Sequence, residues 1–325
     1  MEILVTGGGG FLGQAIVQQL LARGDHVRVL NRSHYPELEA KGVRSYVGDI
    51  ADIDAVMAAA DGVDAIIHVA AKAGSGLYKP DFYRANVVGT ENVLSACHTH
   101  GIGYLVYTSS PSVVHAGGDI EGGDESLPYA THFDAPYPET KAQAEAMILK
   151  ANSASLKTVA LRPHLIWGPG DNQLLPRLVE KNNGRGIRLP APHKKIDTVY
   201  VDNAAHAHLL ALDALIKNNS AAGRAFFISN DEPMEIAHIM TGLIEAAGYK
   251  PNIRPIPRWL AMGLASVVEG IWRLLRRRSE PPLSRFVVEH LATAHWYDLS
   301  QAREVLGYVP QISIDQGLSR LRERQ

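Results

Sequence analysis

The feature that most constrains the fold is a glycine-rich turn near the N-terminus, Thr6-Gly-Gly-Gly-Gly-Phe-Leu-Gly13. The turn follows a short apolar run and opens the helical pattern of Phe11–Arg23. Gly7 permits a tight turn, Gly10 lets the backbone approach a pyrophosphate, and Gly13 lets the helix pack closely on the strand. The start of the helix offers unpaired N–H groups and a positive dipole end to phosphates. This context predicts a dinucleotide-binding fold, in which the turn contacts the cofactor through Gly7, Gly10, Phe11, Leu12 and Gly13.

Short apolar runs alternate with helical patterns through the first half of the chain. The expected strands are Ile3–Thr6, His26–Leu30, Val43–Val47, Ala65–Val69, Tyr104–Thr108 and Thr158–Leu161. The expected helices are Phe11–Arg23, Ile53–Ala60, Tyr83–His98 and Thr140–Asn152. Such alternation predicts a parallel sheet with helices on both faces, which is the doubly wound α/β architecture of Rossmann-type domains.

The character of the sequence changes after Arg162. Five prolines between positions 163 and 192 interrupt a loop-rich stretch. A lobe formed there would lie over the carboxyl ends of the sheet, where open α/β sheets bind their ligands. We therefore expect a nucleotide-binding domain of residues 1–162 with a returning segment near 198–230, and a smaller, discontinuous substrate lobe of residues 163–197 and 231–325.

The end of the second expected strand bears on the choice of cofactor. NAD-binding domains usually carry an acidic residue here, about 20 residues beyond the glycine turn, for the ribose hydroxyls. Asn31 occupies this place without a negative charge, and Arg32 offers a guanidinium to a 2′-phosphate. The pattern favours NADP(H) over NAD(H). Alternatively, Arg32 is a solvated surface charge and the protein takes either cofactor.

Two further strand ends are candidate walls of a cofactor site. Asp49 and Ile50 follow the third expected strand, where Asp49 could accept a hydrogen bond from the adenine amino group. Ala70 and Ala71 follow the fourth, and their small side chains permit close approach of the nicotinamide-side ribose. Each stretch is also compatible with an ordinary strand end.

A tyrosine and a lysine four residues apart, Tyr137 and Lys141, lie at the start of an expected helix and share one face of it. A free tyrosine has a pKa of ~10, and a nearby ammonium is expected to lower it. The phenol can then give a proton to a carbonyl oxygen as hydride reaches the carbon, or remove it in reverse. Ser110, after the fifth strand, is the candidate donor to the substrate oxygen, with Ser109 as the alternative. These residues predict an oxidoreductase with Tyr137 as its acid/base.

The composition argues against several other classes of function. The 32 basic and 34 acidic residues nearly cancel, which gives no support to a nucleic-acid partner. A single cysteine excludes an internal disulfide and fits a reducing compartment. With no signal-peptide pattern and no bilayer-spanning apolar run, a cytoplasmic protein is expected. No metal site is expected, because His206 and His208 lie two apart and point to different faces of a helical pattern.

Together these motifs resemble the extended short-chain dehydrogenase/reductase superfamily over essentially the whole chain. Besides the glycine turn and Tyr137/Lys141, the matching stretches are Gly48-Asp-Ile50, Ala85-Asn-Val-Val-Gly-Thr-Glu-Asn92, Tyr107-Thr-Ser-Ser110 and Leu161-Arg-Pro163. The resemblance implies the fold and the catalytic roles given above. It also implies that Asn86 and Pro163 help to line the cofactor site, and, by analogy alone, that the protein is a homodimer.

Within the superfamily, Ile166-Trp-Gly-Pro-Gly-Asp171 and Val199-Tyr-Val-Asp-Asn203 are similar to the 3β-hydroxysteroid dehydrogenase branch. Stretches at 32–38, 167–173, 280–285, 295–297 and 307–311 resemble the bacterial 2-alkyl-3-oxoalkanoate reductases of long-chain olefin biosynthesis. The latter resemblance implies NADPH and a two-chained, apolar β-keto acid as substrate. Three alternatives are a 3β-hydroxysteroid or sterol-4-carboxylate 3-dehydrogenase, a nucleotide-sugar epimerase and a non-catalytic NAD(P)-sensing regulator.

An apolar, amphipathic stretch lies near the C-terminus. Trp259–Leu275 carries apolar residues along one helical stripe and is followed by Arg276-Arg-Arg278. One interpretation is a lid that packs on the substrate lobe. The other is that residues 259–278 form a surface for a membrane or a partner enzyme, which would make the protein peripherally membrane-associated.

Overall fold

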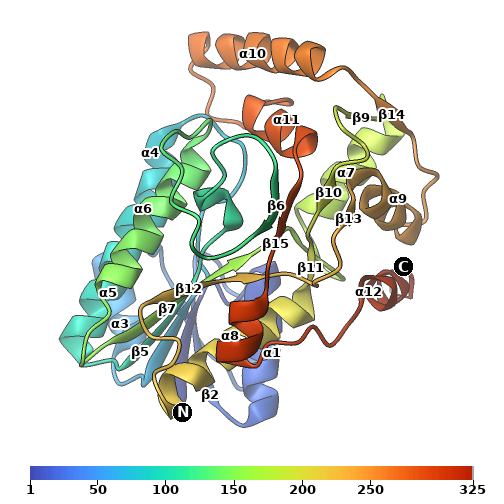
Figure 1. Ribbon diagram of the computed structural model, residues 1–325. Helices are drawn as coiled ribbons and strands as arrows, with labels where there is room; N and C mark the ends of the chain where they lie inside the picture. The colour runs from blue at the N-terminus through green and yellow to red at the C-terminus, as the bar shows by residue number, and fades with distance from the viewer. Residues whose placement is uncertain (324–325) are drawn as a thin grey trace.

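A seven-stranded parallel sheet forms the centre of the computed structural model, which describes residues 1–323 (Figure 1). The strand order is β12-β7-β5-β4-β1-β2-β3, and every neighbouring pair is parallel. The chain changes direction across the sheet between β1 and β4, the switch point at which doubly wound sheets bind ligands. The predicted Rossmann-type fold is confirmed. The strands of this sheet are β1 (Glu2–Thr6), β2 (His26–Asn31), β3 (Arg44–Val47), β4 (Ala65–His68), β5 (Tyr104–Thr108), β7 (Lys157–Pro163) and β12 (Arg224–Ile228).

Helices cover both faces of the sheet because successive side chains of each strand point to opposite faces. In β1, Ile3 and Val5 pack into the apolar layer of α1 and α8, whereas Leu4 packs into the layer of α3, α5 and α6. All three side chains are fully buried. The covering helices are α1 (Phe11–Arg23), α3 (Ile53–Ala60), α5 (Gly89–His100), α6 (Pro136–Lys150) and α8 (Val201–Lys217).

A smaller lobe lies over the carboxyl ends of the sheet and contains three small sheets, β13-β10-β15-β6, β11-β8 and β14-β9 (Figure 1). Strand β6 comes from the loop between β5 and α6, so part of the first 162 residues joins the sheet of this lobe. The strands are β6 (Ile120–Gly123), β8 (Ile166–Trp167), β9 (Ile187–Leu189), β10 (Lys195–Ile196), β11 (Val199–Tyr200), β13 (Met234–Glu235), β14 (Ile253–Pro255) and β15 (His295–Tyr297). The helices are α7 (Leu174–Asn183), α9 (Ile236–Ala246), α10 (Arg258–Leu274), α11 (Arg285–Ala292) and α12 (Ile314–Arg322).

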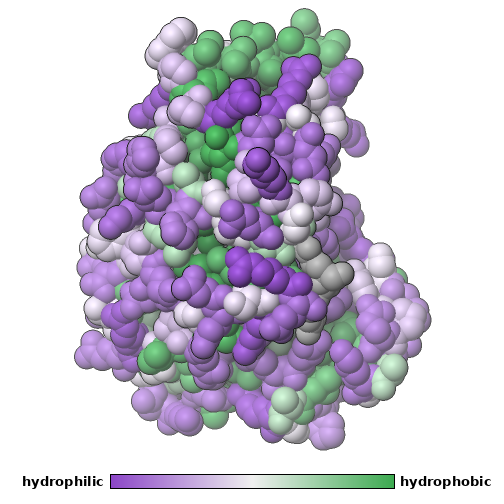
Figure 2. Space-filling view, turned by 90° about the vertical axis from the view of Figure 1, so that its right-hand side faces the viewer, coloured by the Kyte–Doolittle hydropathy of each residue, from purple (hydrophilic) through white to green (hydrophobic). Residues whose placement is uncertain are grey.

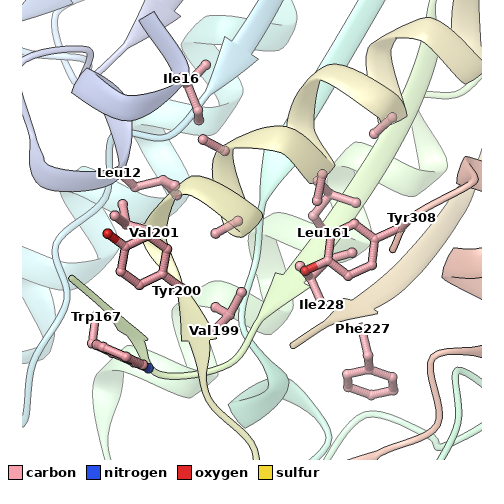
Figure 3. Close-up of a cluster of buried hydrophobic side chains, with 14 of the residues drawn as sticks. Leu12, Ile16, Leu161, Trp167, Val199, Tyr200, Val201, Phe227, Ile228 and Tyr308 are labelled. Atoms are coloured by element: carbon pink, nitrogen blue, oxygen red, sulfur yellow. The ribbon is translucent and has the colours of Figure 1, made fainter. Parts of the chain in front are cut away.

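An apolar core joins the lobe to the sheet (Figure 3). The rings of Trp167 and Tyr200 meet edge to face with their centroids 5.4 Å apart, and both side chains are buried. Tyr308 is also buried, and its hydroxyl donates to the carbonyl oxygen of Ser229 at 2.9 Å. This contact anchors the segment after η3 (Ala302–Leu306) beside β12. The lobe is therefore held in place by packing rather than by surface contacts alone.

Two helices depart from the predicted bounds at positions that matter for the site. The pattern predicted as one helix over Tyr83–His98 consists of a π-helical segment, η1 (Tyr83–Val88), followed by α5, and the short helix α4 (Lys79–Phe82) precedes it. A π-helical turn changes the hydrogen-bonding register and is frequent at functional sites. Helix α6 begins at Pro136 because proline is favoured in a first turn. Two short elements complete the description, α2 (Pro36–Glu39) and the 3₁₀ turn η2 (Pro111–Val113).

Candidate active site

The carboxyl ends of the central strands open into a cavity of about 1600 Å³ that is also lined by residues of the smaller lobe. The glycine turn and the first turn of α6 face this same space. Of the residues singled out from the sequence, only Asn86 is absent from the cavity wall that the described residues form. Those in the wall are Gly7, Gly10, Phe11, Leu12, Gly13, Asn31, Arg32, Asp49, Ile50, Ala70, Ala71, Ser110, Tyr137, Lys141 and Pro163.

The glycine turn fits a pyrophosphate. Gly7 has a φ of +71°, and a Cβ added to it would come within 3.0 Å of the Ala70 backbone. A Cβ on Gly13 would lie 2.1 Å from the carbonyl oxygen of Gly7, so only glycine permits this approach of helix to turn. Gly10 caps α1, and no side chain in residues 1–323 caps that helix start. The first N–H groups of α1 are therefore left for an anion, as a bound dinucleotide requires.

Asn31 supports the turn as well as lining the cavity. Its Oδ1 accepts a hydrogen bond from the N–H of Gly9 at 2.9 Å, and the side chain is buried. This bond ties the glycine turn to the end of β2. Arg32 follows on the surface; it is exposed at the cavity wall and forms no ion pair within the described part of the chain. Its guanidinium is thus available to an anionic ligand.

Asp49 already has partners within the protein. One carboxylate oxygen accepts from the N–H of Ala51 at 3.0 Å, and the other lies 3.1 Å from the Arg84 guanidinium. The side chain remains 32% exposed, so it retains an open edge toward the cavity. Asp49 therefore also pins the start of the π-helical segment to the end of β3.

Asn86, which is expected to help line the cofactor site, is not among the described residues that line the cavity. Asn86 is 1% exposed and lies behind the cavity wall, where its Oδ1 accepts from the N–H of Lys72 at 2.7 Å. Its Nδ2 donates to the carbonyl oxygen of Lys72 and to Oγ1 of Thr140, both at 3.0 Å. Thr140 in turn donates to the carbonyl oxygen of Tyr137. Asn86 is a positioning residue that joins the segment after β4 to the first turn of α6.

Tyr137 and Lys141 lie one turn apart on α6, and both reach the cavity. Tyr137 is half-buried, whereas Lys141 is only 2% exposed. The Lys141 ammonium donates to the carbonyl oxygen of Thr108 at 2.5 Å and lies 4.2 Å from the centroid of the Tyr107 ring. Lys141 therefore fixes the end of β5, the strand that leads into Ser110.

The expectation that Lys141 lowers the pKa of Tyr137 is not met by the protein's own groups. Burial raises the pKa of Tyr137, and a hydrogen bond with Ser110 opposes that rise. Burial also lowers the pKa of Lys141 to about 7, against the opposing charge of Glu145. Desolvation of both groups has a larger effect on their pKa values here than the charge of the lysine has on the tyrosine.

Ser110, rather than Ser109, is directed to the tyrosine. Ser110 caps η2 by accepting from the N–H of Ser112, and the Oγ atoms of these two serines are 2.9 Å apart. Its hydroxyl also interacts with the phenol of Tyr137 and opposes the rise in the pKa of that phenol. The hydroxyl of Ser109 is buried without a hydrogen-bond partner among the described residues. The site therefore has a tyrosine and a serine hydroxyl side by side, which suits a ligand oxygen.

Two buried groups near the site are not indicated by any sequence motif. Arg162 and Glu145 form an ion pair with Nη2–Oε1 of 2.6 Å, and their side chains are 5% and 0% exposed. Glu145 lies one turn beyond Lys141 on α6, and Arg162 directly precedes Pro163. The second group comprises four histidines in the cavity wall, His115, His164, His290 and His295. Neither group has a sequence signal, because its members come from distant elements.

The apolar face of α10 points to solvent. The packed side of this helix consists of Ala261, Ala265 and Glu269, and its large apolar residues are exposed. Figure 2 shows this green surface across the top of the molecule. We call it the α10 stripe; it comprises Trp259, Leu260, Leu264, Val267, Ile271, Leu274 and Leu275. Within residues 1–323, no helix has the length and apolar character needed to cross a membrane.

The comparisons with known proteins agree with the motifs. Residues 4–258 match the 3-beta hydroxysteroid dehydrogenase/isomerase family. The chain is 51% identical over 325 residues to a 2-alkyl-3-oxoalkanoate reductase of Stenotrophomonas maltophilia, covering 99% of this chain and 98% of the relative. It is 34% identical to the decarboxylating sterol-4-alpha-carboxylate 3-dehydrogenase of Homo sapiens, covering 97% and 86%. The UDP-glucose 4-epimerase of Thermus thermophilus in complex with NAD has a similar fold, with a TM-score of 0.73 at 24% identity over 99% of both chains.

Proposed function

Because this chain belongs to the 3-beta hydroxysteroid dehydrogenase/isomerase family and is an NAD(P)-dependent oxidoreductase, we propose that it reduces the 3-keto group of a long-chain 2-alkyl-3-oxoalkanoate with NADPH. The observation that carries the proposal is that Tyr137, Ser110 and the glycine turn line one cavity. The 51% identity to a reductase of this name over nearly both whole chains supports the substrate class.

In the proposed reaction, Tyr137 donates the proton. Burial raises its pKa, so the phenol is protonated at neutral pH and can give its proton to the ketone oxygen. Ser110 bonds to Tyr137 and would hold the same oxygen as negative charge develops on it. Lys141 secures the strand end that carries Ser110 through the bond to Thr108. When bound, the reduced nicotinamide supplies the hydride.

The walls of the smaller lobe suit two alkyl chains. Helices α7, α9, α10 and α11 and the loop before α11 contribute apolar side chains to the cavity, and such walls favour burial of a greasy ligand. This feature suits a sterol as well as a fatty β-keto acid. The apolar lining residues from these segments include Leu178, Met240, Leu264, Leu283, Val287 and Leu291.

The substrate class is tested by NADPH oxidation with three sets of compounds at matched concentrations: 2-alkyl-3-oxo acids, 3-oxo sterols and nucleotide-sugar ketones. The highest kcat/KM is expected for the 2-alkyl-3-oxo acids. A higher value for sterols would assign the chain to the sterol dehydrogenases instead. NADPH binding with no turnover of any ketone would favour a cofactor-sensing regulator.

Arg32 tests the cofactor preference. Replacing Arg32 with alanine should lower kcat/KM with NADPH by about tenfold to a hundredfold, the effect of losing one hydrogen bond to a charged phosphate. The value with NADH should stay unchanged, because NADH has no 2′-phosphate. The matched control is Lys41→Ala, which removes an exposed cation outside the cavity wall. Equal wild-type values for NADPH and NADH would contradict the preference.

We further propose that the α10 stripe and Arg276–Arg278 rest on an anionic membrane surface. The stripe supplies an apolar face that can enter the membrane interface. The three arginines supply the complementary charge, and each arginine contributes about 1 kcal/mol of binding free energy near such a surface. Ala261 and Leu264 of the same helix line the cavity, so α10 adjoins both the cavity and the proposed membrane surface. A substrate with two long chains would be concentrated at that surface.

Co-sedimentation with vesicles tests this proposal. The wild type should bind vesicles that contain phosphatidylglycerol more tightly than pure phosphatidylcholine vesicles. Replacing Arg276, Arg277 and Arg278 with glutamine should remove that preference. The double variant Val267→Ser and Leu274→Ser should weaken binding to both kinds of vesicle. Equal binding by all variants would overturn the membrane proposal. Self-association that depends on the stripe would assign it to a second copy of the chain, and retention by another enzyme alone would assign it to a protein partner.

A further inference from the structure

Four histidines from separate parts of the chain meet in the cavity wall. His115 follows η2, His164 follows β7, His290 lies on α11 and His295 begins β15. The ring centroids of His164 and His295 are 4.8 Å apart, and those of His115 and His290 are 4.7 Å apart. The rings of His290 and His295 join the two pairs at 5.5 Å. We call this group the histidine cluster; the proposed proton transfer from Tyr137 does not use it.

The histidine cluster lies beside the strand end that carries Ser110. Strands β5 and β7 are parallel neighbours, with Thr108 opposite Leu161. Two residues further on, Ser110 and Pro163 reach the same edge of the sheet, and His164 comes next. A chemical group held by His164 would therefore be adjacent to the part of the ligand that Ser110 contacts.

Backbone acceptors determine where the protons of these rings lie. His295 Nε2 is 2.8 Å from the carbonyl oxygen of His290, so this nitrogen donates. In neutral His295, Nδ1 must then accept, and it lies 2.8 Å from Nε2 of His164. Neutral His164 accordingly carries its proton on Nε2, and its Nδ1 has a free lone pair.

That Nδ1 atom is left without a partner. His164 is 7% exposed, and its Nδ1 makes no hydrogen bond to any residue in the range 1–323. An unpaired polar atom in a buried position costs about 1–3 kcal/mol, and a ligand that pairs with it would remove that cost. His164 lines the cavity, which has room for such a ligand. A ligand suited to Nδ1 of His164 either donates a proton to this nitrogen or is an anion that stabilises the protonated ring.

The neutral histidine cluster would bind an acidic ligand together with a proton. Burial and the three other histidines hold the pKa of His164 well below its ordinary value. An anion bound beside His164 would raise that pKa, so binding would be coupled to uptake of a proton. The carboxylates near the cluster act on other members of it: Glu289, Asp119 and Asp134 act on His115, and Asp119 also acts on His295. Glu289 is paired with Arg258, and Asp197 accepts from the N–H of Tyr297.

We propose that the histidine cluster, through Nδ1 of His164, binds the carboxyl group of the substrate and selects 3-keto acids over neutral ketones. This inference rests on the proposed function, because in a 3-oxo acid the carboxyl carbon is two bonds from the ketone carbon. A substrate whose ketone oxygen contacts Tyr137 and Ser110 must place its carboxyl group close by. One proton is then shared between the carboxylate and His164, and no covalent bond is made or broken.

Binding of a compound that cannot be reduced separates this inference from the proposed activity. Isothermal titration calorimetry compares a branched fatty acid without a ketone with its methyl ester, in two buffers of different ionisation enthalpy. The wild type should bind the acid at least tenfold more tightly than the ester. The acid should take up about one proton per molecule bound, and the ester none.

The variant His164→Gln locates the effect. Glutamine places its amide near the position of Nε2, so it can keep the bond to His295 while lacking a group at Nδ1. Its affinity for the acid should fall at least tenfold, whereas its affinity for the ester should stay within twofold. Equal losses for both ligands, or no proton uptake by the wild type, would overturn the carboxyl site. If the acid binds as described but no 3-keto acid is reduced, the proposed function fails and the carboxyl site stands.

Discussion

Replacing Tyr137 with phenylalanine is expected to lower kcat for ketone reduction by about 10²–10⁴-fold, the usual contribution of a positioned general acid. The change removes only the hydroxyl, so the ring can keep its packing and its place in the first turn of α6. Ser110 loses the bond to Tyr137 but keeps its contact with Ser112. Stopped-flow or steady-state NADPH oxidation measures the loss, and fluorescence titration should show unchanged NADPH affinity.

A matched substitution distinguishes loss of the acid from a general effect of tyrosine replacement. Tyr249 is 43% exposed and lies outside the cavity wall, so Tyr249→Phe should retain the wild-type rate. If Tyr137→Phe kept more than a tenth of the wild-type kcat, Tyr137 would not be the proton donor. A fall in NADPH affinity that accounts for the whole effect would likewise assign the phenol to binding rather than to proton transfer.

The raised pKa of Tyr137 suits ketone reduction better than alcohol oxidation. Because burial raises the pKa, the free protein holds the phenol protonated through neutral pH. A protonated phenol is a ready donor for ketone reduction, whereas alcohol oxidation first requires its deprotonation. The proposed reductase therefore needs no lysine-driven ionisation of the tyrosine before substrate arrives. This differs from the expectation formed on the Tyr137/Lys141 spacing alone.

Much of the fold and one half of the site were predictable because the relevant interactions are local. The strand, glycine turn and helix of the first 23 residues determine one another through turn geometry and close packing, so the pattern of glycines was sufficient. Tyr137 and Lys141 are likewise neighbours on one helix. The division of the buried strand residues between two apolar layers is also predictable, because successive side chains along a strand point to opposite faces of the sheet.

The rest of the site depends on contacts between distant segments. Asn86 bonds to Thr140 across 54 positions, and His164 bonds to His295 across 131. No spacing in the sequence reveals such pairs, so the sequence alone predicts neither the hydrogen bonds of Asn86 nor the histidine cluster. For α10, the sequence predicted the stripe but not its outward direction, which follows from small residues such as Ala261 and Ala265 on the packed side.

The buried ion pair of Arg162 and Glu145 should give the largest stability effect. Replacing Arg162 with methionine leaves the Glu145 carboxylate in the interior without its cation, and such a loss costs about 3–5 kcal/mol of unfolding free energy. The Tyr129 hydroxyl also donates to Glu145, at 2.9 Å, but it does not replace the missing charge. Urea unfolding followed by circular dichroism measures the difference. Arg320→Met is the control, because this exposed arginine pairs with the exposed carboxylate of Asp202 and its loss should cost less than about 1 kcal/mol.

A double variant separates the value of the pair from the cost of an orphaned charge. When Glu145 is also replaced by methionine, neither a buried charge nor its unmet desolvation remains, so much of the lost stability should return. The recovered protein should nevertheless have an altered site, because Glu145 opposes the burial-driven fall in the pKa of Lys141, one turn earlier on α6. Without that charge, Lys141 loses its proton at lower pH and donates less strongly to the carbonyl oxygen of Thr108. We therefore expect the double variant to have near-normal stability. As the pH is raised, its kcat should begin to fall at a lower pH than the kcat of the wild type. A double variant as unstable as Arg162→Met would show that the pair itself, rather than relief of one uncompensated charge, holds α6 against β7.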